Sequence, residues 1–344
     1  MPFTTIKKPS DYFNTKLYTG NGGTQSITGL DFQPDWVWIK ERSSTSSHAL
    51  FDAIRGATIK LSSNNTDANN TSTADLTSFN SDGFTNGNSG AVNESGQTYA
   101  SWNWKANGSG SSNTDGSITS TVSVNTTSGF SIVKYTGNSS AGATIGHGLG
   151  VVPNVIIAKK LNNTSNWSVY HSGLGNFAKV LSLNTTSAAT TDSGVWDNVP
   201  TSSRFLVGSD NTTNANGDDY IAYCFAEKQG FSKFGSYTGN GNADGPFIYT
   251  GFKPAFYIIK SATGTRSWII KDNKRPGYNV NGSYLLANGS EVEGTGSGNV
   301  ASDECSNGFK IRGTSTSLNF SGETYIYMTF AEEPLVGDNP ATAR

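Results

Sequence analysis

Charged side chains are scarce in this chain: Asp, Glu, Lys and Arg make up 15% of its 344 residues, whereas about a quarter is typical of soluble domains. The formal net charge is −2, and the Lys and Arg residues form no cluster. Proteins that bind DNA or RNA need such a basic patch to neutralise phosphates. Nucleic acid is therefore not an expected partner.

Long apolar runs and cysteines are also lacking. No stretch reaches the ~20 apolar residues of a membrane-spanning helix, and residues 1–8 lack the apolar segment of a secretory signal. We therefore expect no membrane insertion. The two cysteines, Cys224 and Cys305, are too few for a disulfide framework, so we expect both to be reduced.

Ser, Thr, Asn and Gly supply most of the polar surface instead, with 40 glycines among them. These residues favour turns and compete with helix interiors. Because 34% of the residues are still hydrophobic, the chain can bury real cores. The composition therefore predicts an all-β protein of short strands joined by many turns.

The tetrapeptide Tyr-Thr-Gly-Asn occurs three times, at 18–21, 135–138 and 237–240. After each copy come, in one order, a Gly-hydrophobic segment ending in Pro, an apolar strand ending in Lys, a second aromatic segment, a Leu-containing segment, a Phe-centred strand and a Tyr-led last strand. Chance does not supply such a series three times. The pattern therefore predicts three diverged copies of one structural unit.

The last strand of each copy alternates large apolar residues with smaller or polar ones. This period of two predicts an antiparallel strand with one face inward and the other partly wet, while the uniformly apolar strand after each Pro is expected to be central. Together these features predict three tandem antiparallel β-sandwich repeats of the jelly-roll or lectin-like kind. The large positions are Ala100, Trp102 and Trp104, then Ile221, Tyr223 and Phe225, then Ile326, Met328 and Phe330.

The joins between the copies differ in composition. Residues 107–126 are rich in Gly, Ser and Thr, which predicts a flexible linker and a hinged first repeat, whereas the second and third repeats follow each other closely and should be rigidly joined. The expected organisation is an N-terminal anchoring arm (1–16), repeat 1 (17–106), the linker (107–126), repeat 2 (127–229), repeat 3 (230–334) and a C-terminal tail (335–344).

Residues suited to catalysis or metal binding are few. His48, His147 and His171 occupy non-equivalent places in the repeats and lack Cys or acidic partners at metal-ligand spacing. Asp218-Asp219 lacks the further oxygen ligands of a calcium loop, so a structural cation there is the weaker interpretation. No nucleophile–base pair or carboxylate pair stands out. We therefore expect no catalytic residue, no metal or cofactor site and no enzymatic activity.

Most of the seven tryptophans lie at repeat landmarks where the other copies carry Val, Ile, Phe or Met, which indicates a place in the core. Trp196 lies in a loop segment without an evident counterpart in the other copies. We therefore take Trp196 as the candidate surface contact, with packing beneath a loop as the alternative.

Five segments carry a resemblance to a known family: 8–15, 32–40, 81–85, 99–106 and 146–153. They resemble the repeats of tail-fibre-like and other virion structural proteins of marine bacteriophages. The resemblance spans Lys8 to Pro334, is weakest in the third repeat, and brings no active-site pattern. It implies a virion component that is assembled in the host cytoplasm.

The expected function is a tail- or fibre-associated module for host attachment, whose loop tips bind weakly and gain strength through avidity. The expected partners are other virion proteins, held by the N-terminal arm, and a host surface glycan or protein. A homo-oligomer is expected and a trimer favoured, although three repeats could also give one chain a pseudo-threefold shape. The alternative is a capsid decoration or cement protein that stabilises the phage head; a polysaccharide-degrading tail enzyme is the least supported hypothesis.

Overall fold

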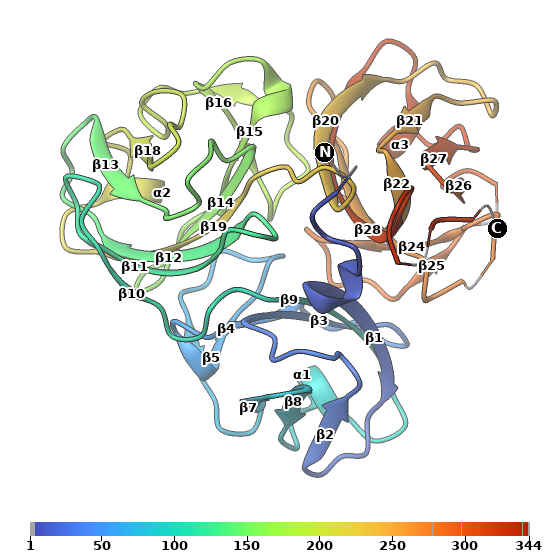
Figure 1. Ribbon diagram of the computed structural model, residues 1–344, viewed down its shortest axis with the longest axis horizontal. Coiled ribbons are helices and arrows are strands. Elements are labelled where there is room, and N and C mark those ends of the chain that lie inside the picture. Colours follow the sequence, from blue (N-terminus) through green and yellow to red (C-terminus); the bar gives the residue numbers. More distant parts are fainter. Residues whose placement is uncertain (1–3, 277, 297, 339, 343–344) are drawn as a thin grey trace.

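The computed structural model describes residues 4–276, 278–296, 298–338 and 340–342. Its strands pair in antiparallel sheets, and the sheets form three lobes around a common centre (Figure 1). The predicted all-β, antiparallel sandwich class is confirmed. The described residues contain no helix that is long and apolar enough to cross a membrane.

Lobe 1 (residues 4–106) pairs a six-stranded sheet with a three-stranded one. The large sheet has the order β1 (Phe13–Thr19), β9 (Thr98–Trp104), β3 (Trp36–Glu41), β4 (Ala49–Asp52), β5 (Gly56–Leu61) and β6 (Asn70–Thr71). The small sheet has the order β2 (Gln25–Thr28), β8 (Gly83–Asn86) and β7 (Leu76–Asn80). Two short helices, η1 (Pro9–Asp11) and α1 (Gly90–Asn93), complete the lobe.

Lobe 2 (residues 107–229) has a larger main sheet. Its order is β10 (Ser111–Asn113), β11 (Ser120–Asn125), β12 (Phe130–Thr136), β19 (Asp219–Phe225), β14 (Val155–Lys160), β15 (Ser168–His171), β16 (Lys179–Ser182) and β17 (Thr190–Thr191). The small sheet pairs β13 (Ala143–Gly146) with β18 (Arg204–Val207). The short helices are η2 (Ser172–Leu174) and α2 (Asn211–Asn214).

Lobe 3 (residues 230–334) repeats the order of lobe 1. The large sheet runs β20 (Ser232–Thr238), β28 (Thr324–Pro334), β22 (Phe252–Ser261), β23 (Ile269–Asp272), β24 (Ser283–Leu286) and β25 (Gly294–Thr295). The small sheet runs β21 (Phe247–Tyr249), β27 (Gly308–Ile311) and β26 (Ser302–Cys305), and the short helix is α3 (Thr316–Asn319). In every lobe the last strand therefore lies between the strand that contains the Tyr-Thr pair of the repeated tetrapeptide (β1, β12 or β20) and the apolar strand near the Pro motif (β3, β14 or β22).

The molecule has two kinds of apolar core. One core lies between the two sheets of each lobe, and a fourth, which we call the central core, lies between the three large sheets. Aromatic rings from all three lobes meet in the central core: Trp36 lies 4.3 Å from Tyr223, and Phe13 lies 5.2 Å from Phe330, between ring centroids. The lobes are thus held to one another by a shared apolar core.

The central core corrects the expected environment of the last strand. Its large residues, such as Trp104, Phe225 and Phe330, point into the central core rather than into the sandwich, and the smaller residues on the opposite face pack inside each lobe. Both faces of β9, β19 and β28 are therefore buried, not half wet. A lone sandwich would leave one face in water, but here the neighbouring lobes cover it.

A pair of backbone hydrogen bonds recurs at each junction between lobes. Each junction uses the same two kinds of segment, so the contacts run head to tail and close after three steps, as in a cyclic trimer. The bonds run from Asn69 N to Leu161 O (2.8 Å) and Ser165 N to Thr66 O (2.8 Å), from Ala189 N to Ala262 O (2.9 Å) and Arg266 N to Thr186 O (2.8 Å), and from Glu293 N to Arg42 O (2.9 Å) and Ser46 N to Ser290 O (2.9 Å). One chain therefore builds a closed, three-membered ring.

The segment expected to be a flexible linker, residues 107–126, forms β10 and β11 instead. β11 pairs with β12 over six residues, from Ser120–Tyr135 to Asn125–Phe130. At the join with lobe 1, the Asp35 carboxylate accepts hydrogen bonds from the backbone N–H groups of Ala106 (2.7 Å) and Gly108 (3.0 Å). Lobe 1 is therefore fixed to the rest of the ring rather than hinged.

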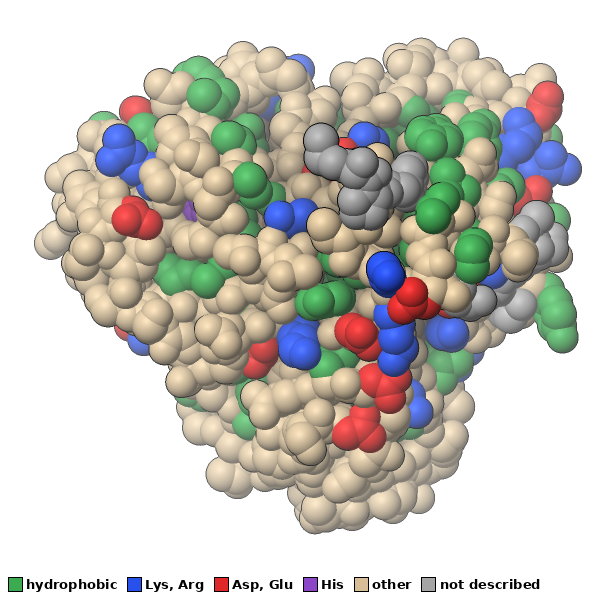
Figure 2. Space-filling view, viewed as in Figure 1, with side chains coloured by type: hydrophobic (Ala, Val, Ile, Leu, Met, Phe, Trp, Pro, Cys, Tyr) green, Lys and Arg blue, Asp and Glu red, His purple; other side chains and the backbone are tan. Residues whose placement is uncertain are grey.

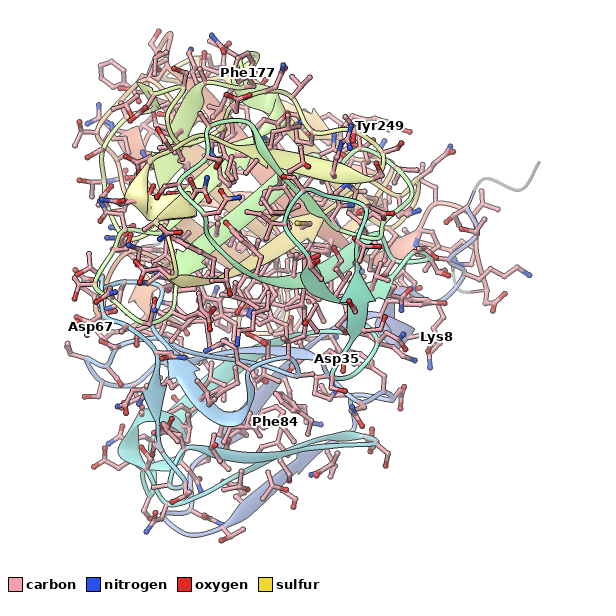
Figure 3. The ribbon with its side chains drawn as sticks, turned by 90° about the vertical axis from the view of Figure 1, so that its left-hand side faces the viewer. Lys8, Asp35, Asp67, Phe84, Phe177 and Tyr249 are labelled. Atoms are coloured by element: carbon pink, nitrogen blue, oxygen red, sulfur yellow. The ribbon has the colours of Figure 1, made fainter. Side chains whose placement is uncertain are left out.

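The described part of the expected N-terminal arm, residues 4–16, also packs on the ring. Ile6 and Phe13 are each 2% exposed and lie in the central core, and β1 begins at Phe13. Residues 1–3 of this arm lie outside the described residues, as do 339 and 343–344 of the expected C-terminal tail. Figure 3 places Lys8 and Tyr249 toward the same face of the molecule and Asp67 at the opposite one.

Candidate functional site

Trp196, the contact residue expected from the sequence, is buried and therefore not a surface contact. Its side chain is 1% exposed and packs edge-on against Tyr170 and Phe205 inside lobe 2. The backbone of Trp196 forms an isolated antiparallel β-bridge with Val207 of β18. In the other lobes, Leu76 and Ser302 pair in the same way with the strands equivalent to β18, which are β8 and β27. The alternative, packing beneath a loop, describes the place of Trp196. The other six tryptophans are also buried, as the sequence predicts for most of them, but they lie in the central core between the lobes: Trp36, Trp38, Trp102, Trp104, Trp167 and Trp268.

The three histidines serve as internal hydrogen-bonding residues. His48 accepts a hydrogen bond from Trp38 Nε1 at Nδ1 (2.7 Å), so its Nε2–H donates to Leu286 O of lobe 3 (2.9 Å). Trp167 and Trp268 make the same kind of bond at the other two junctions, to Ser62 O and Ser182 O. Burial disfavours the charged ring and lowers the pKa of His48 to about 3. His48 is therefore a structural contact between lobes.

His171 and His147 are equally enclosed. His171 Nδ1 accepts from Gly173 N (2.9 Å), and Nε2 lies 3.0 Å from Tyr327 O of lobe 3, while His147 Nδ1 accepts from Leu149 N at a turn (3.2 Å). Across the described ranges, no three His, Cys, Asp or Glu residues gather as metal ligands would. Asp218 is held by Lys160, whose ammonium group lies 2.7 Å away and lowers the pKa of this carboxyl.

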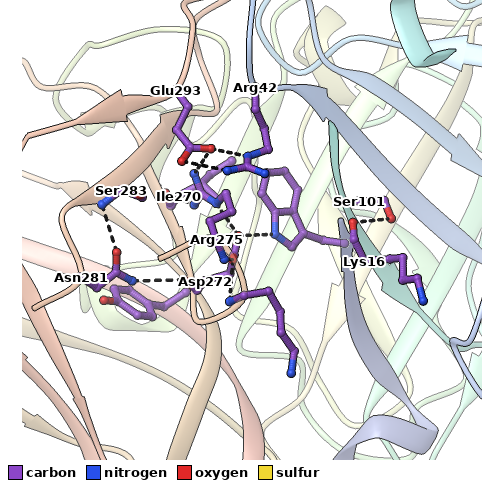
Figure 4. A network of polar contacts seen from close by, with 12 residues as sticks. Lys16, Arg42, Ser101, Ile270, Asp272, Arg275, Asn281, Ser283 and Glu293 are labelled. Carbon is purple, nitrogen blue, oxygen red and sulfur yellow. Dashed lines mark hydrogen bonds and ion pairs between the residues drawn. The ribbon is translucent and has the colours of Figure 1, made fainter. Parts of the chain in front are cut away.

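Charged residues at the junction of lobes 3 and 1 form a buried network (Figure 4). Trp102 Nε1 donates to Asp272 Oδ2 (3.0 Å), and Arg275 Nε donates to the same oxygen (2.6 Å). Arg42 of lobe 1 pairs with Glu293 of lobe 3 beside them. The junction of lobes 1 and 2 repeats the motif, because the Tyr223 hydroxyl donates to Asp52, which also pairs with Arg55. These charges hold the lobes together.

Two of the exposed aromatic residues of lobe 3 lie on one strand. In β21, Phe247 and Tyr249 are 45% and 56% exposed, whereas Ile248 between them is 5% exposed and packs in the lobe core. The alternation follows because successive side chains of a strand point to opposite faces of the sheet, and the small sheet has one face on the core and the other in water. The corresponding strands carry Ser26 and Thr28 around Ile27, and Thr144 and Gly146 around Ile145. The fold therefore does not require aromatic residues there.

Tyr249 borders a hollow of about 300 Å³ at the junction of lobes 2 and 3, the two upper lobes, between which Figure 2 shows a furrow. Glu227 follows the end of β19 and Lys233 lies on β20; their side chains pair at 2.8 Å and are about one third exposed (32% and 37%). The lining residues are Glu227, Gln229, Gly230, Ser232, Lys233, Tyr249, Thr250 and Gly251.

The hollow combines one exposed aromatic ring with a carboxylate, an amide, an ammonium group and hydroxyls. Such a combination suits a polar, ring-shaped ligand, because the ring face packs against apolar C–H groups while the polar side chains bind hydroxyls. Glu227 is the single carboxylate among the lining residues. The sequence signal for this combination was the aromatic pair at positions where the other repeats carry Ser, Thr or Gly.

The family model of a domain of unknown function (DUF7483) matches residues 8–334. The comparisons with curated proteins and with solved structures found no match. The matched region runs from η1 to the end of β28, so it covers all three lobes as one unit. The chain therefore belongs to the DUF7483 family.

Proposed function

We propose that this protein is a bacteriophage virion structural protein, a tail- or fibre-associated module that attaches to the host surface through the hollow beside Tyr249. The observation that carries the proposal is the exposed pair Phe247 and Tyr249, placed where the fold needs no aromatic residue. The resemblance of the repeats to phage virion proteins supports it. The bound group would be a host surface glycan or protein.

The ring architecture suits this role because it offers a rigid platform. The central core and the paired backbone hydrogen bonds at the three junctions hold the hollow in one geometry, so little conformational entropy is lost on binding. Avidity then comes from several copies of the chain on one particle, and the homotrimer stays a prediction. Since residues 4–16 pack on the ring, we propose that other virion proteins contact a face of the folded body.

The first prediction concerns binding to intact host cells. The double variant Phe247→Ala and Tyr249→Ala should bind at least about 10-fold more weakly, since aromatic contacts of this kind are each worth about 1 kcal/mol. The measurement is cell binding of the labelled protein and of virions. Thr28→Ala, at the corresponding exposed position of lobe 1, serves as the matched control and should bind normally.

Immunogold labelling of virions tests the assignment itself. Label on the tail or fibres supports the attachment module, and label on the head would instead establish the alternative, a capsid decoration protein. If purified virions lack the protein, the proposal is wrong. Release of reducing sugars from host envelope polysaccharide, abolished by Glu227→Gln, would replace it with an enzymatic function.

A further inference from the structure

One buried position inside lobe 3 carries a polar side chain where the other two lobes carry an aromatic one. Lys271 of β23 pairs with Tyr257 in the register in which Phe51 pairs with Val37 and Tyr170 pairs with Ile156. Lys271 thus replaces an aromatic core residue and is itself fully buried. Because the same backbone frame accepts Phe and Tyr, the fold does not require a lysine at this position.

Two further buried polar residues surround this lysine. Asn281 precedes β24 and Glu304 lies on β26, so the three residues come from both sheets of the lobe, and Asn281 and Glu304 are also fully buried. Lys271 Nζ donates to the backbone oxygen of Asn281 (2.6 Å). The side-chain amide of Asn281 donates to Glu304 Oε1 (2.8 Å), and the Tyr257 hydroxyl donates to the same oxygen (2.7 Å).

We propose that Lys271 and Asn281 become joined by an intramolecular isopeptide bond, with Glu304 as the proton-transferring residue. The geometry supplies the three groups that this reaction needs: an amine hydrogen-bonded to the backbone oxygen of Asn281, the side-chain amide of the same residue, and a carboxylate that accepts a hydrogen bond from the amide nitrogen. The inference concerns the interior of lobe 3 and does not depend on the proposed host attachment.

The reaction balances without any oxidant or co-reactant. The neutral amine Nζ attacks Cγ of Asn281, and the new Cγ–Nζ bond replaces the Cγ–Nδ2 bond. Glu304 accepts a proton from Nζ and delivers it to Nδ2, which leaves as ammonia. Burial lowers the pKa of Lys271 to about 7, so a substantial fraction of the amine is neutral and nucleophilic near neutral pH.

The bond would also remove an unfavourable feature of the lobe. A buried ammonium group carries a desolvation cost, and conversion to an amide abolishes the charge. The cross-link would close the loop between β23 and β24, on which Tyr278 and Val280 are 81% and 54% exposed. The loop would then be anchored covalently to the lobe interior beneath those exposed residues.

Intact mass spectrometry of the full-length protein tests the proposal. The protein should be lighter than its sequence mass by one ammonia, about 17 Da, and a tryptic digest should contain one branched peptide joining Lys271 to Asn281. Lys271→Met and Glu304→Gln, checked for folding by circular dichroism, should both have the full sequence mass. Lys260→Met, a buried lysine at the end of β22, is the matched control and should keep the mass loss.

A succinimide at Asn281, which precedes Gly282, would give the same mass loss without a cross-link. It would persist in Lys271→Met, whereas the isopeptide bond would not. A wild-type protein with the full sequence mass, a mass loss that persists in Lys271→Met, or recovery of Lys271 and Asn281 in separate linear peptides would each overturn the proposal.

Discussion

At the scale of single residues, equivalent positions in the three lobes make the same hydrogen bond between lobes with different side chains. At each junction a ring N–H must reach a backbone oxygen of the next lobe: Trp167 and Trp268 do so with indole groups, and His48 does so with Nε2. His48 has a second partner, because Trp38 Nε1 donates to its Nδ1. The positions equivalent to Trp38 are Ile157 and Ile258, which need no acceptor. Trp38 and His48 therefore form a coupled pair.

The coupled pair gives a prediction on stability. His48→Trp alone leaves the buried Trp38 N–H without its acceptor and should lower the free energy of unfolding by about 1–3 kcal/mol. Adding Trp38→Ile reproduces the arrangement of the other lobes and should recover part of this loss. Urea unfolding at pH 7 measures both effects. Equal stability of the single and double variants would contradict the coupling.

The buried histidines His48 and His171 should make the protein less stable in acid. Burial lowers the pKa of His48 to about 3 and of His171 to about 4, below the value of about 6.5 in unfolded chains. The unfolded state therefore takes up protons first, so the contribution of these residues is complete above about pH 6.5 and declines as the pH falls toward 3–4. Urea unfolding from pH 7 to pH 4 should show this decline, and Trp38→Ile with His48→Trp should show a smaller one.

At the scale of elements, the sequence predicts which segments form strands better than it predicts what those strands face. Large residues at alternate positions show that Trp104, Phe225 and Phe330 are buried, but a pattern within one strand does not distinguish a sandwich interior from a contact between lobes. The 107–126 segment shows the opposite difficulty. Its Gly and Ser content resembles a linker, although Val122 and Val124 alternate as in a strand. Comparison of the repeats could show that Lys271 is unusual, but it could not show that Asn281 and Glu304 lie beside it.

β11 provides the test at this scale. Val122 is 5% exposed and lies in the core of lobe 2, whereas Thr121 beside it points to the other face and is partly exposed. Val122→Ala should lower the free energy of unfolding by about 1–2 kcal/mol, and Thr121→Ala should change it little. If residues 107–126 were a flexible linker, both substitutions would be neutral in chemical unfolding, and the amides of β11 would exchange rapidly.

At the scale of the whole molecule, the ring makes each lobe dependent on the other two. A separated lobe 1 would expose Trp36, Trp38, Trp102 and Trp104, each at most 1% exposed in the ring, and would lose two of the three junctions. Burying this much aromatic surface is worth several kcal/mol per lobe. We therefore expect full-length protein to unfold in one cooperative calorimetric transition, with a van't Hoff enthalpy close to the calorimetric enthalpy. Trp104→Ala should lower the midpoint of that single transition, because the cavity lies in the core that all three lobes share. Three separate transitions, with only one of them shifted by Trp104→Ala, would instead show that the lobes are independent domains.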